Sequence, residues 1–144
     1  MRPGRGVLDT SVVILLDQLD ERSDLPEEPF ITAVTLAELS VGPLVTDDKG
    51  ERATRQARLQ VTEASFDPLP FDASAARAFG RVAAELRRAG RKDRPRSFDA
   101  MIAATAIARG LPLFTANAKD FAGIEGLDVV SITGVTGVTG VTGD

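Results

Sequence analysis

The stretch V-L-D-T-S-V-V-I-L-L, residues 7–16, places an aspartate inside an apolar run. The two residues before the aspartate are typical of the end of a buried strand, and those after it are typical of a helix. Asp9, Thr10 or Ser11 would serve as the helix N-cap, because short oxygen side chains accept from the free N–H groups of a first turn. Alternatively, Asp9 marks a ligand site, because ligands of an open α/β sheet bind at the carboxyl ends of its strands.

Strand and helix patterns alternate along the rest of the chain. Apolar runs predict strands at residues 6–9, 30–34, 111–115 and 127–132. Helical spacing, caps and stop signals predict helices at about residues 10–19, 35–41, 51–64, 72–89 and 97–108. Residues 66–71 contain two prolines and predict at most a short edge strand. This alternation predicts an α/β fold, in which helices cover both faces of a parallel sheet.

The composition of the 144-residue chain excludes several kinds of site. The sequence contains no cysteine, histidine, tryptophan or tyrosine. Disulfides, Cys/His zinc sites, Ser-His-Asp triads and Cys-His pairs are therefore impossible. Any catalysis must come from carboxylates, hydroxyls, Lys, Arg, backbone amides or a cofactor. Oxygen ligands suit hard cations such as Mg2+ or Mn2+.

Length and hydropathy predict one globular domain, residues 1–132, followed by a tail. No apolar stretch approaches the roughly 18 residues of a membrane span. Asp9 and Asp17 interrupt the apolar run near the N-terminus, which argues against a signal peptide. We therefore expect a cytoplasmic protein. The tail, residues 133–144, contains a Gly-Val-Thr repeat and is expected to be flexible or to add one short strand.

The net charge of −4 gives no general reason to expect nucleic-acid binding, but the charge is unevenly distributed. Residues 17–28 are strongly acidic, and residues 77–96 are strongly basic. A local basic stretch is the electrostatic signature of a surface that binds a phosphate backbone. A solvated helix face, with cations favoured at its C-terminal end, explains the same pattern.

Four carboxylates occupy similar places in the predicted fold. Asp9 and Asp120 follow strands, whereas Glu38 and Asp99 lie in the first turns of helices. In a parallel sheet, the strand ends and the starts of the following helices share one edge, so the four acids could meet there. Unpaired, they would repel one another, and a bound divalent cation would remove that penalty.

Each acid also has a simpler structural explanation. Thr35 and Glu38 have the spacing of a capping box, and Asp99 in a first turn is favoured by the helix dipole. Asp120 fits as a turn cap before Phe121. However, the segments A-V-T-L-A-E-L and S-F-D-A-M-I-A-A surround their acids with apolar residues. Partly buried carboxylates cost free energy unless they are paired or bound to metal.

Four motifs in order resemble those of PIN-domain ribonucleases, and above all those of bacterial VapC toxins. They are D-T-S at 9–11, T-L-A-E-L at 35–39, F-D-A-M-I-A-A at 98–104 and F-T-A-N-A-K-D-F at 114–121. The resemblance extends from about Val7 to Ile132. It implies a three-layer α/β/α sandwich with a mostly parallel sheet and a metal-dependent endoribonuclease activity. It also implies a cognate antitoxin that blocks the acidic site, and a homodimer.

Residue by residue, the resemblance assigns the first three family acids to Asp9, Glu38 and Asp99. The fourth position is open between Asn117, where some members carry an acid, and Asp120, the nearest acid in this chain. The implied cofactor is Mg2+ or Mn2+, and the implied nucleophile is a water activated by the metal. Whether one or two ions bind is left open.

Further side chains are implied to support or extend the site. Those placed to orient a carboxylate or a water are Thr10, Ser11, Thr115 and Asn117. Those that are candidates to hold RNA phosphates are Arg87, Arg88, Arg94 and Arg96. Phe98 is expected in the core, with stacking on an RNA base as the alternative.

Two other functions remain compatible with an acidic cluster. In a receiver-like signalling domain, the acids would bind Mg2+, one Asp would be phosphorylated, and Thr115 and Lys119 would be the switch residues. Against this, no acid directly precedes Asp9, and no Asp ends the strand at 111–115. The third hypothesis is a catalytically inactive interaction module, which a metal titration would test.

Overall fold

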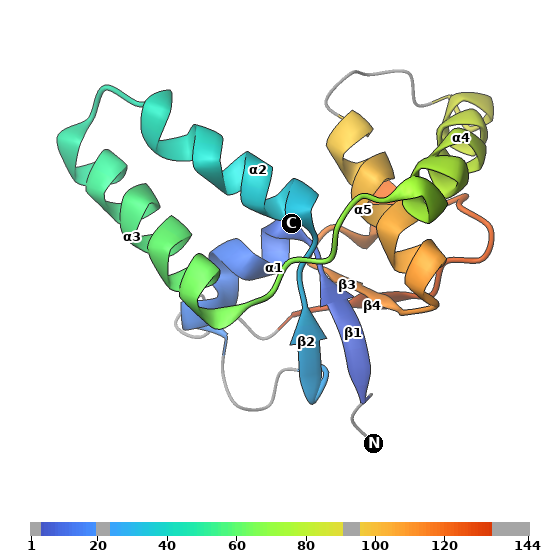
Figure 1. Cartoon of the computed structure of the whole chain (residues 1–144), viewed down its shortest axis with the longest axis horizontal. Helices are drawn as coiled ribbons and strands as arrows, with labels where there is room; N and C mark the ends of the chain where they lie inside the picture. Colours follow the sequence, from blue (N-terminus) through green and yellow to red (C-terminus); the bar gives the residue numbers. More distant parts are fainter. Residues whose placement is uncertain (1–3, 20–23, 91–95, 134–144) are drawn as a thin grey trace.

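Four short strands form one parallel sheet at the centre of the fold (Figure 1). They are β1 (Arg5–Leu8), β2 (Glu28–Phe30), β3 (Leu113–Thr115) and β4 (Val129–Ser131), in the order β2-β1-β3-β4. The computed structural model describes residues 4–19, 24–90 and 96–133. Because β1 pairs with β2 on one side and β3 on the other, Asp9 follows the end of a central strand.

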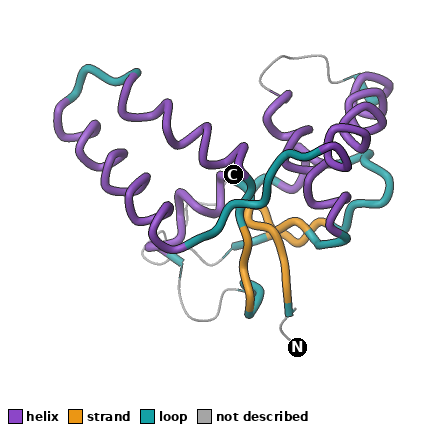
Figure 2. The backbone as a smooth tube through the Cα atoms, in the orientation of Figure 1, coloured by secondary structure: helices purple, strands orange, loops and turns teal. Residues whose placement is uncertain are grey.

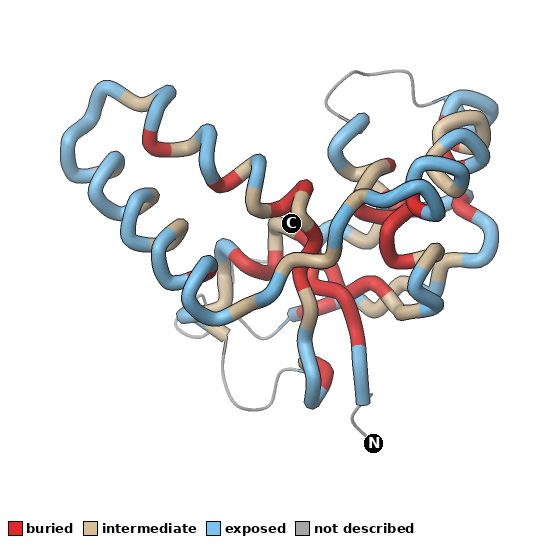
Figure 3. The backbone as a smooth tube through the Cα atoms, viewed as in Figure 1, coloured by how far each residue is buried: buried red, intermediate tan, exposed pale blue. Residues whose placement is uncertain are grey.

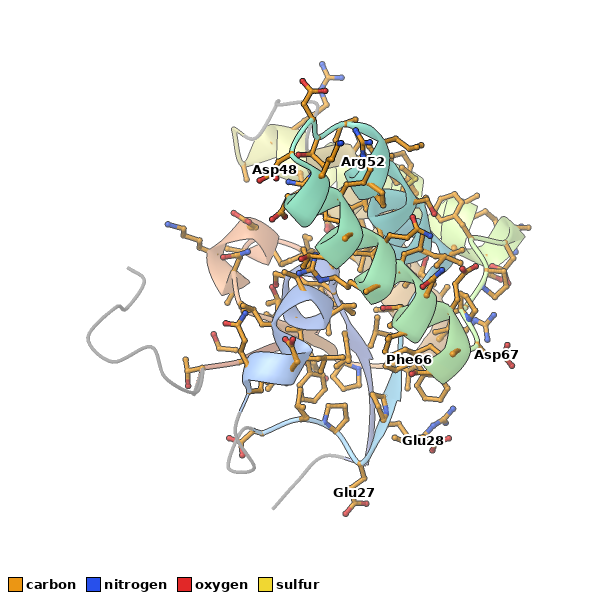
Figure 4. The ribbon with its side chains drawn as sticks, turned by 90° about the vertical axis from the view of Figure 1, so that its left-hand side faces the viewer. Glu27, Glu28, Asp48, Arg52, Phe66 and Asp67 are labelled. Atoms are coloured by element: carbon orange, nitrogen blue, oxygen red, sulfur yellow. The ribbon has the colours of Figure 1, made fainter. Side chains whose placement is uncertain are left out.

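The helices connect and flank these strands (Figure 2). The α-helices are α1 (Thr10–Leu15), α2 (Ala33–Val41), α3 (Lys49–Ser65), α4 (Ala73–Arg88) and α5 (Arg96–Arg109). The short 3-10 helices are η1 (Leu16–Gln18), η2 (Gly42–Leu44) and η3 (Ala118–Phe121). The 17-residue α3 begins after Asp48, whose side chain caps it, and ends before Phe66 (Figure 4).

Alternate residues of the strands point to opposite faces of the sheet, which produces two core clusters. Val7 and Leu113 belong to the cluster on the side of α4 and α5. Leu8 and Phe114 belong to the cluster on the other side, where α1 packs. Buried residues therefore concentrate in the strands and in the helix faces against them (Figure 3). The predicted three-layer α/β/α sandwich with a parallel sheet is confirmed.

α2 contributes to both core clusters. Val34 packs in the cluster of α4 and α5, and Leu39 packs in the cluster of α1. α2 and α3 then form a hairpin on one side of the molecule, and α4 and α5 pack together on the other (Figure 1).

The second strand differs from the prediction. β2 ends at Phe30, whereas the apolar run predicts a strand at residues 30–34. Thr32 is the N-cap of α2, and its Oγ1 accepts from the backbone N–H of Thr35 at 3.1 Å. The apolar run at residues 30–34 is largely buried because the chain passes from β2 directly into the buried first turn of α2. An apolar run by itself does not distinguish these two conformations.

Other element boundaries follow the prediction closely. α4 is capped by Asp72, whose carboxylate accepts from Ala75 N at 3.0 Å. The segment at 66–71 contributes one isolated bridge, between Leu69 and Thr32, in place of an edge strand. The tail at 134–144 lies outside the described residues, so its predicted flexibility stays a prediction.

Gly6 in β1 is required by the packing of one aromatic ring. A Cβ atom at Gly6 would lie 2.2 Å from Cε1 of Phe114, which is fully buried. Phe114 therefore packs directly over the backbone of β1. Among the described segments, no helix is both long and apolar enough to cross a bilayer.

Candidate functional site

Asp9 lies at the junction of β1 and α1, where its role as a helix N-cap is confirmed, whereas its role in a ligand site stays a prediction. Its backbone N–H donates to the Phe114 carbonyl at 3.0 Å, which extends the pairing of β1 with β3. Its Oδ1 accepts from Val12 N at 3.1 Å, so Asp9 is the N-cap of α1. The side chain is nevertheless only 4% exposed. A buried cap at the carboxyl end of a central strand is an unusual place for a charge, because burial disfavours the ionised form.

Two hydroxyl groups hold the Asp9 carboxylate from opposite sides. Ser11 Oγ donates to Oδ1 at 2.6 Å, and Thr115 Oγ1 donates to Oδ2 at 2.6 Å. The backbone N–H groups of Ala116 and Asn117 donate in turn to Ser11 Oγ at 3.0 Å and to Thr115 Oγ1 at 2.9 Å. Because each hydroxyl has one proton, both protons point at the carboxylate. The carboxylate is therefore fixed in one orientation.

Glu38 is half-buried in α2 and is reached from α1. Thr10 Oγ1 donates to Glu38 Oε1 at 2.5 Å, and Thr10 Oγ1 also lies 3.0 Å from Thr35 Oγ1. The capping-box explanation for Thr35 and Glu38 is wrong, because Thr32 is the cap and Thr35 lies inside the helix. Glu38 instead uses its carboxylate in a contact between two helices.

Asp9 and Glu38 form an electrostatically unfavourable pair. Burial raises the pKa of Asp9, although the hydrogen bonds from Ser11, Thr115 and the backbone partly offset this effect. Burial also raises the pKa of Glu38; the hydrogen bond from Thr10 opposes this, and the negative charge of Asp9 adds to it. The two carboxylates are therefore close enough to interact. A cation at this position would relieve both the burial cost and the repulsion.

Asp99 and Asp120 lie on two other elements, α5 and η3. Asp99 lies half-buried in the first turn of α5. Asp120 lies half-buried in η3, where its backbone N–H donates to the Asn117 carbonyl at 2.9 Å. α5 packs against both α2 and η3. Within residues 4–19, 24–90 and 96–133, no three acidic side chains group closely enough to hold a metal ion. The participation of Asp99 and Asp120 therefore stays a prediction.

The supporting residues divide into two kinds. Thr10, Ser11 and Thr115 each donate a side-chain hydrogen bond to a carboxylate. Asn117 contributes through its backbone N–H, while its side chain is exposed. Thr35 is a further site residue that the sequence reasoning missed. Thr35 lies three residues before Glu38, a spacing that places both on one face of a helix. The same spacing fits a capping box, and that interpretation leaves Thr35 outside the site.

Two of the four arginines expected to hold RNA phosphates lie at the C-terminal end of α4. Arg87 and Arg88 are exposed in the last turn of α4. Arg94 lies outside the described residues, as does the side chain of Arg96, the first residue of α5. Phe98 is 42% exposed, so its expected place in the core is wrong. The first turn of α5 is open to solvent at this position, which leaves the ring partly uncovered.

The fold and the site together define a parallel α/β domain with an acidic pair at the carboxyl edge of its sheet. A model of the PIN domain matches residues 6–127. Ribonuclease VapC5 of Mycobacterium tuberculosis is 43% identical over 127 residues, which cover 86% of this chain and 90% of the relative. The tRNA(fMet)-specific endonuclease VapC of Shigella flexneri is 35% identical over 128 residues, covering 84% and 92%.

A solved structure agrees with these relatives. The crystal structure of VapBC-5 from Mycobacterium tuberculosis, a member of the VapBC family of toxin–antitoxin systems, superposes with a TM-score of 0.73 at 40% identity. The superposition covers 90% of this chain and 99% of that chain. The chain therefore belongs to the PIN-domain family, and within it to the VapC ribonucleases. This membership excludes the receiver-like alternative.

Proposed function

We propose that this chain is an endoribonuclease that hydrolyses RNA with the help of Mg2+ or Mn2+ and acts as the toxin of a toxin–antitoxin pair. The observation that carries the proposal is the buried Asp9 carboxylate, with Glu38 beside it and the pKa of both raised. Its relatives are named ribonucleases or an endonuclease, which supports RNA as the substrate.

The donor chemistry of the site fits a hard divalent cation. Asp9 and Glu38 offer carboxylate oxygens, the ligand type that Mg2+ and Mn2+ prefer. We assign Asp99 and Asp120 as further ligands from the sheet edge, with Asn117 as the alternative to Asp120. When bound, the cation supplies charge stabilisation for the phosphate and a water of lowered pKa.

The chain's own residues have distinct roles around that site. Ser11 and Thr115 hold both oxygens of Asp9, so the carboxylate cannot rotate away from the edge. Thr10 holds one oxygen of Glu38, Oε1, by a hydrogen bond. The basic residues proposed to bind RNA phosphates are Arg87, Arg88, Arg94 and Arg96. These residues would orient the substrate backbone without selecting its sequence.

A partner protein is part of the proposal. The structural relative at 40% identity is a member of a family of toxin–antitoxin systems. We propose that a cognate antitoxin covers the acidic site of this chain and places an Arg or Lys side chain, or an apolar stretch, near Asp9 and Glu38. We further propose that the toxin is a homodimer, and that the complex is a hetero-oligomer.

Replacement of Asp9 by asparagine tests the catalytic proposal. Asparagine is as good an N-cap as aspartate, so Asp9→Asn should preserve α1 and the fold. The purified variant should lose Mg2+-dependent RNA cleavage, while its circular dichroism spectrum stays that of the wild type. Cleavage by the variant at the wild-type rate would overturn the assignment of Asp9.

Expression in cells tests the toxin proposal. Expression of this chain alone should arrest growth, and co-expression of its neighbouring gene product should restore it. The Asp9→Asn variant is the matched control, because it keeps the fold and removes the proposed activity. Normal growth with abundant intact wild-type protein would contradict the toxin assignment.

Metal titration separates the enzyme from a catalytically inactive interaction module. Mg2+ or Mn2+ should raise the melting temperature of the wild type in proportion to the logarithm of its concentration, because a ligand of the folded state stabilises it by mass action. A module without a metal site should show no such rise.

A further inference from the structure

Two hydroxyl groups connect the interior of α2 to the Glu38 carboxylate. Thr35 Oγ1 lies 3.0 Å from Thr10 Oγ1, and Thr10 Oγ1 lies 2.5 Å from Glu38 Oε1. Thr35 is fully buried, whereas Thr10 and Glu38 are half-buried. The connection therefore begins in the protein core and ends at the site.

The number of protons fixes the direction of this chain of hydrogen bonds. An ionised carboxylate only accepts, so the single hydroxyl proton of Thr10 is directed to Glu38. Thr10 Oγ1 consequently acts as the acceptor toward Thr35. Thr35 must donate, and the order is Thr35 to Thr10 to Glu38.

Comparison with other helical threonines shows that the contact of Thr35 is not the ordinary one. Thr54, Thr62 and Thr105 each donate their hydroxyl to the carbonyl four residues earlier, at 3.1, 2.7 and 2.8 Å. The carbonyl four residues before Thr35 belongs to Ile31, which accepts from Leu69 N at 2.9 Å. Thr35 instead directs its hydroxyl across to another helix.

We infer that Thr35 is a positioning residue, which holds Glu38 in its place in the site by directing the hydroxyl of Thr10. This inference rests on the proposed function, because it takes Glu38 as a metal ligand. Without the Thr35 donor, Thr10 Oγ1 keeps only its hydrogen bond to Glu38, so Thr10 and the Glu38 side chain are held less rigidly. Partners that orient a ligand in this way commonly change metal affinity when they are removed.

The test measures metal binding without RNA. The variants are Thr35→Val, which keeps the shape and removes the hydroxyl, and Thr35→Ser, which keeps the hydroxyl. Thr62→Val is the matched control, because Thr62 is also a buried helical threonine, with its hydroxyl bonded to a backbone carbonyl. The readout is the Mn2+ concentration that gives half of the maximal rise in melting temperature.

Thr35→Val should need about tenfold more Mn2+ than the wild type, whereas Thr35→Ser and Thr62→Val should match the wild type. In a Glu38→Gln background, Thr35→Val should cause no additional shift, because its effect passes through Glu38. An equal shift in both backgrounds would mean a general structural effect and would overturn the inference. Thr35→Ala carries the same test if the valine variant does not fold.

The remaining outcomes distinguish this inference from the proposed function. If the wild type responds to Mn2+ and cleaves RNA, but Thr35→Val needs the same Mn2+ concentration as the wild type, the role of Thr35 is overturned and the proposed function stands. A wild type that shows neither a Mn2+ response nor cleavage overturns the proposed function, and the role of Thr35 with it.

Discussion

Thr115 donates a 2.6 Å hydrogen bond to Asp9 across 106 residues of sequence. Thr115 is the last residue of β3, and Asp9 directly follows the neighbouring strand β1, so the bond crosses the carboxyl edge of the sheet. Thr115 Oγ1 is held in turn by Asn117 N at 2.9 Å. The orientation of the buried acid therefore depends on the turn that follows another strand.

Replacing Thr115 by valine should impair the site more than the fold. Thr115→Val removes one of the two side-chain donors to Asp9, and we expect RNA cleavage to fall by about 10- to 100-fold. The free energy of unfolding at neutral pH should fall by about 1.5–3 kcal/mol, the range for hydrogen bonds to charged groups. Urea unfolding and initial cleavage rates measure both effects. Thr115→Ser should restore most of the activity, and a serine variant as impaired as valine would contradict a role for the hydroxyl.

The stability of the metal-free protein should depend on pH through Asp9 and Glu38. Their pKa values in the folded state are raised above the ordinary values of 3.8 and 4.5. The stability that they contribute is therefore complete below those ordinary values and is lost as the pH rises through the raised values. In EDTA, the wild type should therefore lose stability, relative to an Asp9→Asn/Glu38→Gln variant, as the pH rises above the ordinary values of 3.8 and 4.5. Urea unfolding over a series of pH values from below these values to neutral checks this, and a constant difference between the two proteins would refute it.

Asp99→Asn distinguishes a metal ligand from a simple helix-start residue. If Asp99 joins the acidic pair, its neutralisation should stabilise the metal-free protein by about 1 kcal/mol and should remove most of the Mg2+ response. If Asp99 serves only the helix dipole of α5, the variant should be less stable by a few tenths of a kcal/mol. Thermal melts in EDTA and in Mg2+ give the answer. Asp72→Asn, at the exposed N-cap of α4, is the control and should keep the full Mg2+ response.

Arg87 and Arg88 should contribute to RNA affinity by neutralising phosphates. Both are exposed in the last turn of α4. Replacing them by glutamine should weaken the binding of unrelated single-stranded RNAs alike, and should reduce the slope of log affinity against log salt by about 0.7 for each phosphate that is no longer neutralised. Arg77→Gln, in the N-terminal half of the same helix, provides the comparison. Binding curves at several salt concentrations in the Asp9→Asn background avoid cleavage, and an unchanged salt slope would exclude these two arginines.

The sequence alone determined the layered architecture and the location of Asp9. The alternation of apolar runs with helical spacing indicates which residues of each element are buried. Short strands that are buried on both faces require helices on both sides of the sheet. Residues 7–16 also predicted a helix cap at the strand end, at Asp9, Thr10 or Ser11, because capping is a local interaction within one turn, and the structure identifies Asp9 as the cap. These features depend on residues a few positions apart, which is why a sequence pattern contains them.

Only the tertiary structure decided which side chains meet at the site. Thr10 reaches Glu38 across 28 residues and Thr35 across 25, and Thr115 reaches Asp9 across 106. Local chemistry could not rank Thr32 above Thr35 as the cap of α2, because both are threonines near the same helix start. The choice followed from where the chain leaves β2, which is set by the pairing of Phe30 with Val7 in the sheet. Contacts between distant residues depend on strand order and helix packing, and these are properties of the whole fold.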